Sequence, residues 1–207
     1  MDNFLSDKNL IEGITKCIAN AESLIQDAHI LKENKKIERA YTLFQLSLEE
    51  IGKASMVYFF ATLPEDKKLT NLKAFKKDFL DHKTKTTKAI NFDTIILSSI
   101  KDKSDRQRFF NSILSEHDNL DNLNNLKNYS LYTSIIADKF LLPNEIITEN
   151  HLEGIEIRST TRLELIKSTL NFFLANFDEI KKAEQEFDTE QIKAWADEFM
   201  VDLLKED

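Results

Sequence analysis

The chain has 207 residues, of which 42% are hydrophobic and 31% are charged, and its net charge is −8. The apolar content is enough to bury a core, which argues against intrinsic disorder, and the acidic balance argues against a general nucleic-acid-binding protein. The length is within reach of one domain, so we predict a single domain over residues 1–207.

Glycine and proline are rare, with three and two residues respectively. Sheets and hairpins need turns, and turns are rich in these residues, so the composition predicts an all-α fold of long helices with few connections. The single cysteine, Cys17, excludes an internal disulfide and fits a reducing compartment. We expect neither a signal peptide nor a transmembrane span, and therefore a soluble, cytoplasmic protein.

The first two predicted helices are the most regular. A helix over Asn9–Glu33 carries a heptad-like apolar stripe, on which Cys17 is expected to pack as a small hydrophobe. The stripe consists of Leu10, Ile14, Cys17, Ala21, Leu24, Ala28 and Leu31. The next helix, over Lys36–Ala61, has apolar residues on more than one side, which predicts a central helix contacted by two neighbours.

The middle of the chain is predicted to hold helices over Glu65–Ala89, Ser104–Asn124 and Lys127–Ala137, followed by a loop around Pro143. The Asn-rich stretch 121–128 is expected to be a helix end or a bend. The first of these helices carries a run of eight lysines. This run is either an ordinary solvated helix face or a basic stripe that could hold a phosphate backbone.

The C-terminal part is predicted to form a long helix over Glu149–Ala183 and an extra helix over residues 188–205. Gln191 is placed for a capping box at the start of that last helix. With the helices before them, they predict one antiparallel helical bundle.

Several kinds of catalytic site are excluded by the sequence. The three glycines are isolated, which excludes a Gly-rich phosphate-binding loop. One cysteine and four scattered histidines cannot form a zinc site of ordinary spacing, and no Glu-x-x-His pair is present for a di-iron site. We therefore expect no metal and no cofactor, and any catalysis would have to proceed without them.

Four segments in a fixed order carry a family resemblance. They are NAESLIQDAHIL from Asn20; LEEIGKA over Leu48–Ala54; the spaced residues Phe75, Phe79, His82 and Lys85; and LKNYSLY over Leu126–Tyr132 followed by LLPNEIIT around Pro143. The helix ERAYTLFQLSLEEIGKASMVYFF resembles the second helix of HEPN domains, which include prokaryotic toxins and nucleases. More narrowly, the four segments resemble the AbiV family of abortive-infection proteins, over roughly residues 10–150.

This resemblance implies a helical HEPN fold that pairs as a homodimer. It also implies a bacterial, cytoplasmic role in antiviral defence, in which the protein acts as a toxin on the phage-infected cell by attacking RNA or translation. Such a protein would be a ribonuclease or an RNA-binding protein, and a phage-encoded protein is a candidate activator.

HEPN nucleases carry the motif Arg-Asn-x3-His near their dimer interface, and here Lys127, Asn128 and Tyr132 stand at the matching positions. Metal-free RNA cleavage needs a cation that holds the scissile phosphate and a group that moves a proton from the 2′-hydroxyl. We expect Lys127 and Lys85 to hold the phosphate, with His82 or Tyr132 handling the proton. Tyrosine, with an ordinary pKa of about 10, is a poor base near neutrality, whereas histidine titrates in the useful range.

The remaining site residues are given supporting roles by the same resemblance. Lys53, Lys83 and Lys85 would contact RNA, and Glu49 and Glu50, together with Asn128, would orient the catalytic groups.

Five of these residues also have ordinary structural interpretations. Glu49 and Lys53 have the spacing of a stabilising helix pair, and Lys127 that of a cation near a helix C-terminus. His82 could be a core histidine, and Tyr132 a packing tyrosine with a solvated hydroxyl.

Lysine in place of arginine and tyrosine in place of histidine leave a second functional interpretation open. The domain could be a non-catalytic HEPN module that sequesters a phage, RNA or ribosomal partner. A third interpretation is a structural helical bundle without a defence role.

Overall fold

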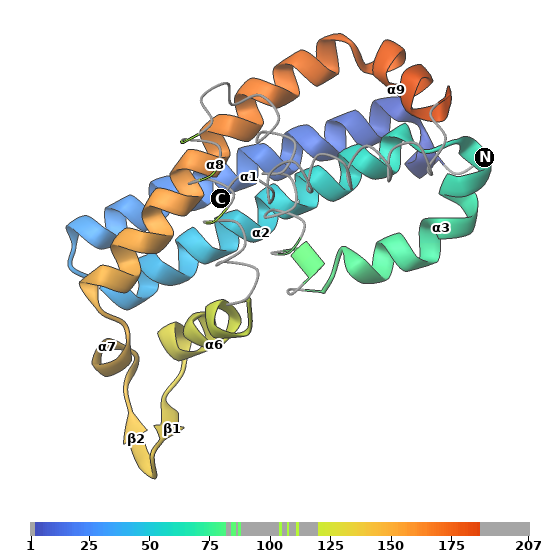
Figure 1. The fold of residues 1–207 in the computed structure, drawn as a ribbon. Coiled ribbons are helices and arrows are strands. Elements are labelled where there is room, and N and C mark those ends of the chain that lie inside the picture. Colours follow the sequence, from blue (N-terminus) through green and yellow to red (C-terminus); the bar gives the residue numbers. More distant parts are fainter. Residues whose placement is uncertain are drawn as a thin grey trace.

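A computed structural model of the chain describes residues 3–81 and 120–186, together with residues 84, 85, 87, 104, 107 and 111. The elements in chain order are η1 (Asn3–Leu5), α1 (Asp7–Glu33), α2 (Ile37–Thr62), α3 (Glu65–Asp78), α6 (Leu120–Leu131), β1 (Ser134–Ile136), β2 (Lys139–Leu141), α7 (Pro143–Ile146), α8 (Glu149–Ala175) and α9 (Phe177–Glu186). Apart from one short hairpin, these elements are helical, so the predicted all-α class is confirmed (Figure 1).

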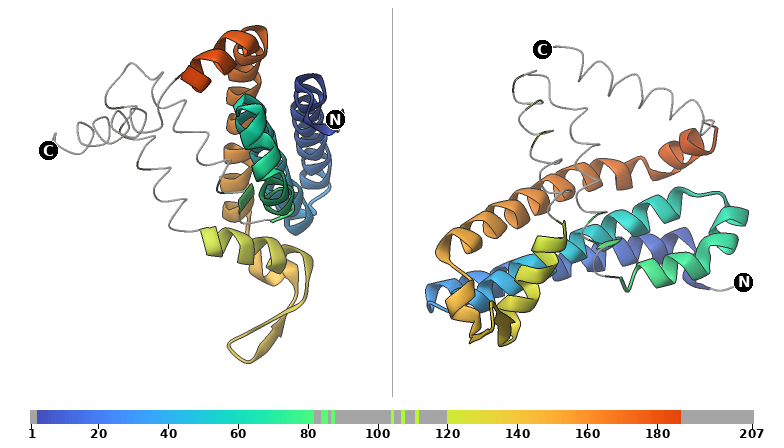
Figure 2. Two further views of the ribbon diagram at one scale, coloured as in Figure 1. Left: turned by 90° about the vertical axis from the view of Figure 1, so that its right-hand side faces the viewer. Right: turned by 60° about the horizontal axis from the view of Figure 1, so that its bottom comes forward.

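The helices α1 and α2 lie antiparallel, and α8 packs along the other side of α2 (Figures 1 and 2). The residues that α1 buries are Leu10, Ile14, Cys17, Ala21, Ile25 and Ala28. The predicted stripe is therefore confirmed with two differences: Ile25 is buried where Leu24 was expected, and Leu31 is only partly buried. A single stripe suffices because α1 lies at the edge of the helical layer and packs mainly against α2.

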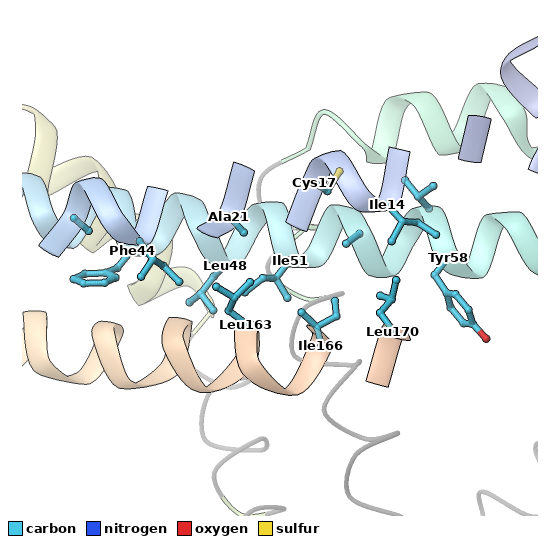
Figure 3. Packing of buried hydrophobic residues seen from close by; sticks show 14 of the residues in the cluster. Ile14, Cys17, Ala21, Phe44, Leu48, Ile51, Tyr58, Leu163, Ile166 and Leu170 are labelled. Carbon is cyan, nitrogen blue, oxygen red and sulfur yellow. The ribbon is translucent and has the colours of Figure 1, made fainter. Parts of the chain in front are cut away.

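The helix α2 is the centre of the hydrophobic core. Figure 3 shows Leu48 and Ile51 of α2 facing Leu163 and Ile166 of α8, with residues of α1 on the other side. Burial of one such aliphatic side chain stabilises the fold by about 1.5–3 kcal/mol. The prediction of a central helix with two neighbours is confirmed.

Cys17 is buried on this core, as predicted. Burial raises the pKa of its thiol to about 11, the nearby Glu50 carboxylate adds to the rise, and the Lys53 ammonium opposes it. The thiol therefore remains protonated at neutral pH.

The predicted helix Glu65–Ala89 is wrong in its extent, because α3 ends at Asp78. The Asp81 side chain gives the physical reason, since its Oδ2 accepts a hydrogen bond from the Thr84 N–H at 2.7 Å. Asp81 thus caps a new helical turn that includes residues 84 and 85. The lysine run is not a uniformly solvated face either, because Lys68 and Lys85 are buried.

A β-hairpin replaces the end of the helix that was predicted over Lys127–Ala137. Instead, α6 continues through the Asn-rich stretch 121–128, ends at Leu131, and is followed by β1 and β2, with Ile135 opposite Phe140. Ala137 and Asp138 form the turn with positive φ angles of 49° and 62°. Such turns favour Asn-Gly, so Ala-Asp gave no recognisable signal. The hairpin projects away from the helices in Figure 1 and in the left view of Figure 2.

The long C-terminal helix predicted over Glu149–Ala183 is divided in two at Asn176. The backbone N–H and the side-chain amide of Asn176 both donate to the Phe172 carbonyl, at 3.2 and 2.8 Å. An asparagine side chain that competes in this way for a helix carbonyl favours a break. The helix α9 then begins at Phe177, with Asp178 and Glu179 in its first turn.

Two further predicted helices lie partly or wholly outside the residues that the structure describes. Of the helix predicted over Ser104–Asn124, residues 104, 107, 111 and 120–124 are described, and the helix predicted over 188–205 lies outside the described residues. None of the helices that are described is both long enough and apolar enough to cross a membrane.

A cluster of four charges ties α1, α3 and α9 together. The fully buried Lys68 ammonium lies 3.0 Å from Asp7 Oδ1 and 3.0 Å from Glu65 Oε1. Lys181 Nζ of α9 lies 2.6 Å from Asp7 Oδ2. Burial alone would raise the pKa of the Asp7 carboxyl, but the hydrogen bonds from Lys181 and Lys68 outweigh it and hold that pKa below the ordinary value of 3.8.

Replacement of Asp7 by asparagine is expected to lower the free energy of unfolding by about 1 kcal/mol at neutral pH, a magnitude that allows for solvent screening of a partly exposed carboxylate. A folded-state pKa below the unfolded one means that the contribution of Asp7 is complete above the unfolded pKa and is lost as the pH falls through the folded pKa. Urea unfolding at several pH values should therefore show that the free energies of unfolding of the parent and of Asp7→Asn become equal in acid.

Asp27→Asn is the matched control, because Asp27 is an exposed carboxylate on the same helix. A difference in the free energy of unfolding between the parent and Asp7→Asn that stays the same in acid would contradict the proposed role of the Asp7 charge.

Candidate functional site

Glu49 is the centre of a cluster that brings together three segments far apart in the sequence. Its Oε1 lies 2.7 Å from Lys127 Nζ of α6, and its Oε2 lies 3.4 Å from Lys85 Nζ in the turn after Asp81. Each ammonium group therefore takes one oxygen of a single carboxylate. Three of the predicted site residues meet at this point.

This cluster is closed to solvent. The side chains of Glu49, Lys85 and Lys127 are 4%, 5% and 7% exposed. An isolated buried charge costs several kcal/mol, so each charge in the cluster depends on an oppositely charged neighbour. The cluster fastens α6 and the Lys85 segment onto α2, and it leaves little of either ammonium group open to a ligand.

A second set of polar contacts joins the same two helices beside the cluster. The hydroxyls of Thr42 in α2 and Ser130 in α6 lie 2.7 Å apart, and the Ser130 hydroxyl also donates to the Lys127 carbonyl at 2.6 Å. Sequence reasoning missed both residues. A signal was present in their spacing, since Thr42 precedes Glu49 by two helical turns and Ser130 follows Lys127 by one.

The predicted helix pair between Glu49 and Lys53 is wrong. The Lys53 ammonium pairs with Glu50 instead, and it lies 5.3 Å from the centre of the Phe79 ring. Adjacent residues of a helix point about 100° apart, so Glu49 faces α6 while Glu50 faces another direction. Lys53, which was predicted to contact RNA, is therefore paired in its own helix.

Asn128 of α6 and Tyr132, which directly follows this helix, lie outside the buried cluster. Both are exposed, and Tyr132 is 64% exposed. They are one turn apart, since the Tyr132 N–H donates to the Asn128 carbonyl at 3.0 Å. The structure thus divides the predicted motif, with Lys127 inside and Asn128 and Tyr132 outside.

Two predicted site residues, His82 and Lys83, lie outside the described residues. Their proposed roles in proton transfer and RNA contact stay predictions.

Two further buried polar residues continue the line of Glu49 along α2. Gln45 and Tyr41 lie one and two turns before it, and among the described residues the Gln45 Oε1 and the Tyr41 hydroxyl have no hydrogen-bond partner. Burial raises the pKa of Tyr41 to about 12, against the opposing effect of the Arg158 charge. The sequence signal for this line of buried polar residues was their helical spacing in an otherwise apolar helix.

No group of three histidine, cysteine or acidic side chains in the described part of the chain is placed to hold a metal ion. The chemistry that the described cluster offers is therefore that of paired ammonium and carboxylate groups.

Comparison with known proteins identifies one family. Residues 9–164 match the model of the family HEPN_AbiV, described as AbiV, and this match covers more than half of the chain. No curated protein and no solved structure matches the chain.

Replacement of Glu49 by glutamine is expected to lower the free energy of unfolding by about 3 kcal/mol, because two buried ammonium groups lose their shared carboxylate. Urea unfolding measures this change. The double variant Glu49→Gln, Lys127→Met should lose less unfolding free energy than the sum of the losses of the two single variants, since both substitutions act on one network.

Glu153→Gln serves as the control, because Glu153 is an exposed carboxylate in the second turn of α8. If Glu49→Gln unfolded at the same urea concentration as the control, Glu49 would not hold the three segments together.

Proposed function

The chain belongs to the AbiV family of HEPN proteins, and we propose that it is an abortive-infection effector that shuts down translation in the phage-infected bacterial cell by binding. Membership of this family suggests a role in phage defence. The bound partner in this proposal is an RNA or a component of the translation machinery, and the action takes place in the cytoplasm.

The burial of Lys85 and Lys127 carries the choice of binding over cleavage. Both ammonium groups are paired with Glu49 and nearly closed to solvent. A metal-independent nuclease needs a cation that reaches the scissile phosphate, close to the group that moves the proton. Among the described residues, the lysines expected to hold phosphate serve the fold instead, which supports a non-catalytic module.

Cleavage of RNA without a metal is the second candidate, and one observation favours it. Asn128 and Tyr132 are exposed and one helical turn apart, which is the arrangement that two neighbouring groups need to act on one substrate. In this version the Tyr132 hydroxyl handles the proton, Asn128 orients the substrate, and His82 is a further candidate for the proton-transfer step.

A homodimer and a phage-encoded activator complete the proposal. Because the exposed Tyr132 lies beside the projecting hairpin, this end of α6 is the part of the described chain that we expect to face a second copy or another partner. An activator would explain how a growth-arresting protein is tolerated in uninfected cells.

The test compares protein synthesis in cell-free extracts of phage-infected and uninfected bacteria. We expect the purified parent protein to inhibit synthesis in the infected extract, and Tyr132→Phe to inhibit it equally, because a binding mechanism does not need the hydroxyl. In parallel, total bacterial RNA incubated with the protein and EDTA, with and without infected extract, should show no discrete cleavage.

Tyr132→Phe suits this test because Tyr132 is exposed, so its loss leaves the core intact. Lys127→Ala is not suitable on its own, because a loss of activity in this variant could come from damage to the fold. If the parent produced discrete RNA fragments and Tyr132→Phe did not, the mechanism would be RNA cleavage and not binding. No inhibition in either extract would contradict the effector role itself.

A further inference from the structure

A pocket opens at the end of the fold where α1 begins and where α2 and α3 end. Its volume is about 590 Å³, within the range typical of small-molecule sites. None of its lining residues belongs to the Glu49 cluster. The pocket therefore needs an explanation of its own.

The walls of this pocket are apolar. Leu10 and Val57 line it from α1 and α2, and Phe75, Phe79 and Leu80 line it from the end of α3 and the turn that follows. Phe75 is held in place because it stacks on Phe60, with ring centres 4.1 Å apart. Leu80 is 75% exposed at the rim. The exposed Leu80 side chain extends the apolar surface of the pocket toward solvent.

Gly13 lines the pocket from the second turn of α1. A glycine there destabilises a helix by about 0.5–1 kcal/mol relative to alanine. Neither the backbone nor the packing requires it, because no glycine has a positive φ angle and an added Cβ would make only an ordinary contact of 3.7 Å with Val57. Because Gly13 lines the pocket, a side chain larger than that of alanine at this position would take up pocket space.

The charges that line the pocket favour an anion. Lys16 is paired with Glu12 at 2.6 Å, whereas the Lys76 ammonium lies 5.0 Å from the centre of the Phe4 ring. These side chains together carry one excess positive charge, although the chain as a whole has a net charge of −8. A ligand with one negative charge would match this excess, with its apolar part in the pocket.

We propose that this pocket binds a carboxylate amphiphile of the fatty-acid type. The aliphatic chain lies between Leu10, Val57 and Phe79, and the carboxylate lies at the rim beside Lys76. The proposal does not depend on the proposed function, since it rests on a different part of the molecule.

Decanoate is the probe, titrated into the full chain by calorimetry below the concentration at which it forms micelles. The parent should bind it saturably with one site per chain. Gly13→Leu, which fills the pocket, and Leu80→Glu, which places a negative charge at the rim, should abolish this binding. Lys76→Gln should weaken it several-fold, and Gly13→Ala should retain it.

Leu69→Glu is the matched control for Leu80→Glu, because Leu69 is also a leucine of this region, 62% exposed, and does not line the pocket. Both leucines are exposed, so neither substitution endangers the fold even if Gly13→Leu fails to fold. Absence of saturable binding by the parent would overturn the proposal, as would binding that Leu80→Glu leaves unchanged. Equal binding by parent and Lys76→Gln would overturn the assignment of an anion.

Discussion

Glu49 is a carboxylate on a helix that is buried on nearly all sides, and the rest of the fold depends on how that charge is accommodated. Water cannot solvate it, so positive groups must come from elsewhere in the chain. Lys127 of α6 and Lys85 of the segment after α3 supply them, each at one oxygen of the carboxylate. These two ion pairs tie α6 and Lys85 to the buried helix α2. Thr42 and Ser130 add a hydroxyl contact that sets how α6 lies along α2.

Much of the helical framework follows from periodicity, because the apolar stripes of α1 and α2 are long and regular. The misjudged ends have local causes. Asp81 caps a new helical turn and Asn176 ends a helix, each through a side-chain hydrogen bond, and Ala137 and Asp138 make a tight turn without glycine. A periodicity that continues across such a residue hides the break, since the bond depends on the geometry of one side chain and not on the pattern around it.

The candidate site was predictable in its membership but not in its geometry. Motif positions selected Glu49, Lys85 and Lys127 without indicating that they contact one another, because the contact depends on how α6 packs against α2. The helix geometry likewise determines that Glu50, and not Glu49, is the partner of Lys53. Two adjacent acids look equivalent in a sequence, whereas the helix turns one toward α6 and the other toward Lys53 and Cys17.

One helix, α2, connects the two regions of interest. Lys53 follows Glu49 by one turn, and its ammonium lies against the Phe79 ring, which in turn lines the pocket at the end of α3. A displacement of Phe79 would therefore reach Lys53 and Glu50 through direct contacts. The buried cluster and the pocket are therefore linked through α2 and Phe79, although they share no residue.

Cys17 has a practical consequence for following this protein in solution. It is the only cysteine of the chain, it is buried, and its thiol pKa is about 11, so very little thiolate exists near neutral pH. A cysteine introduced at an exposed position, such as Asp138 at the tip of the hairpin, would be the one thiol that reacts readily with a maleimide dye. The native chain is thus already suited to single-site fluorescent labelling, without removal of its own cysteine.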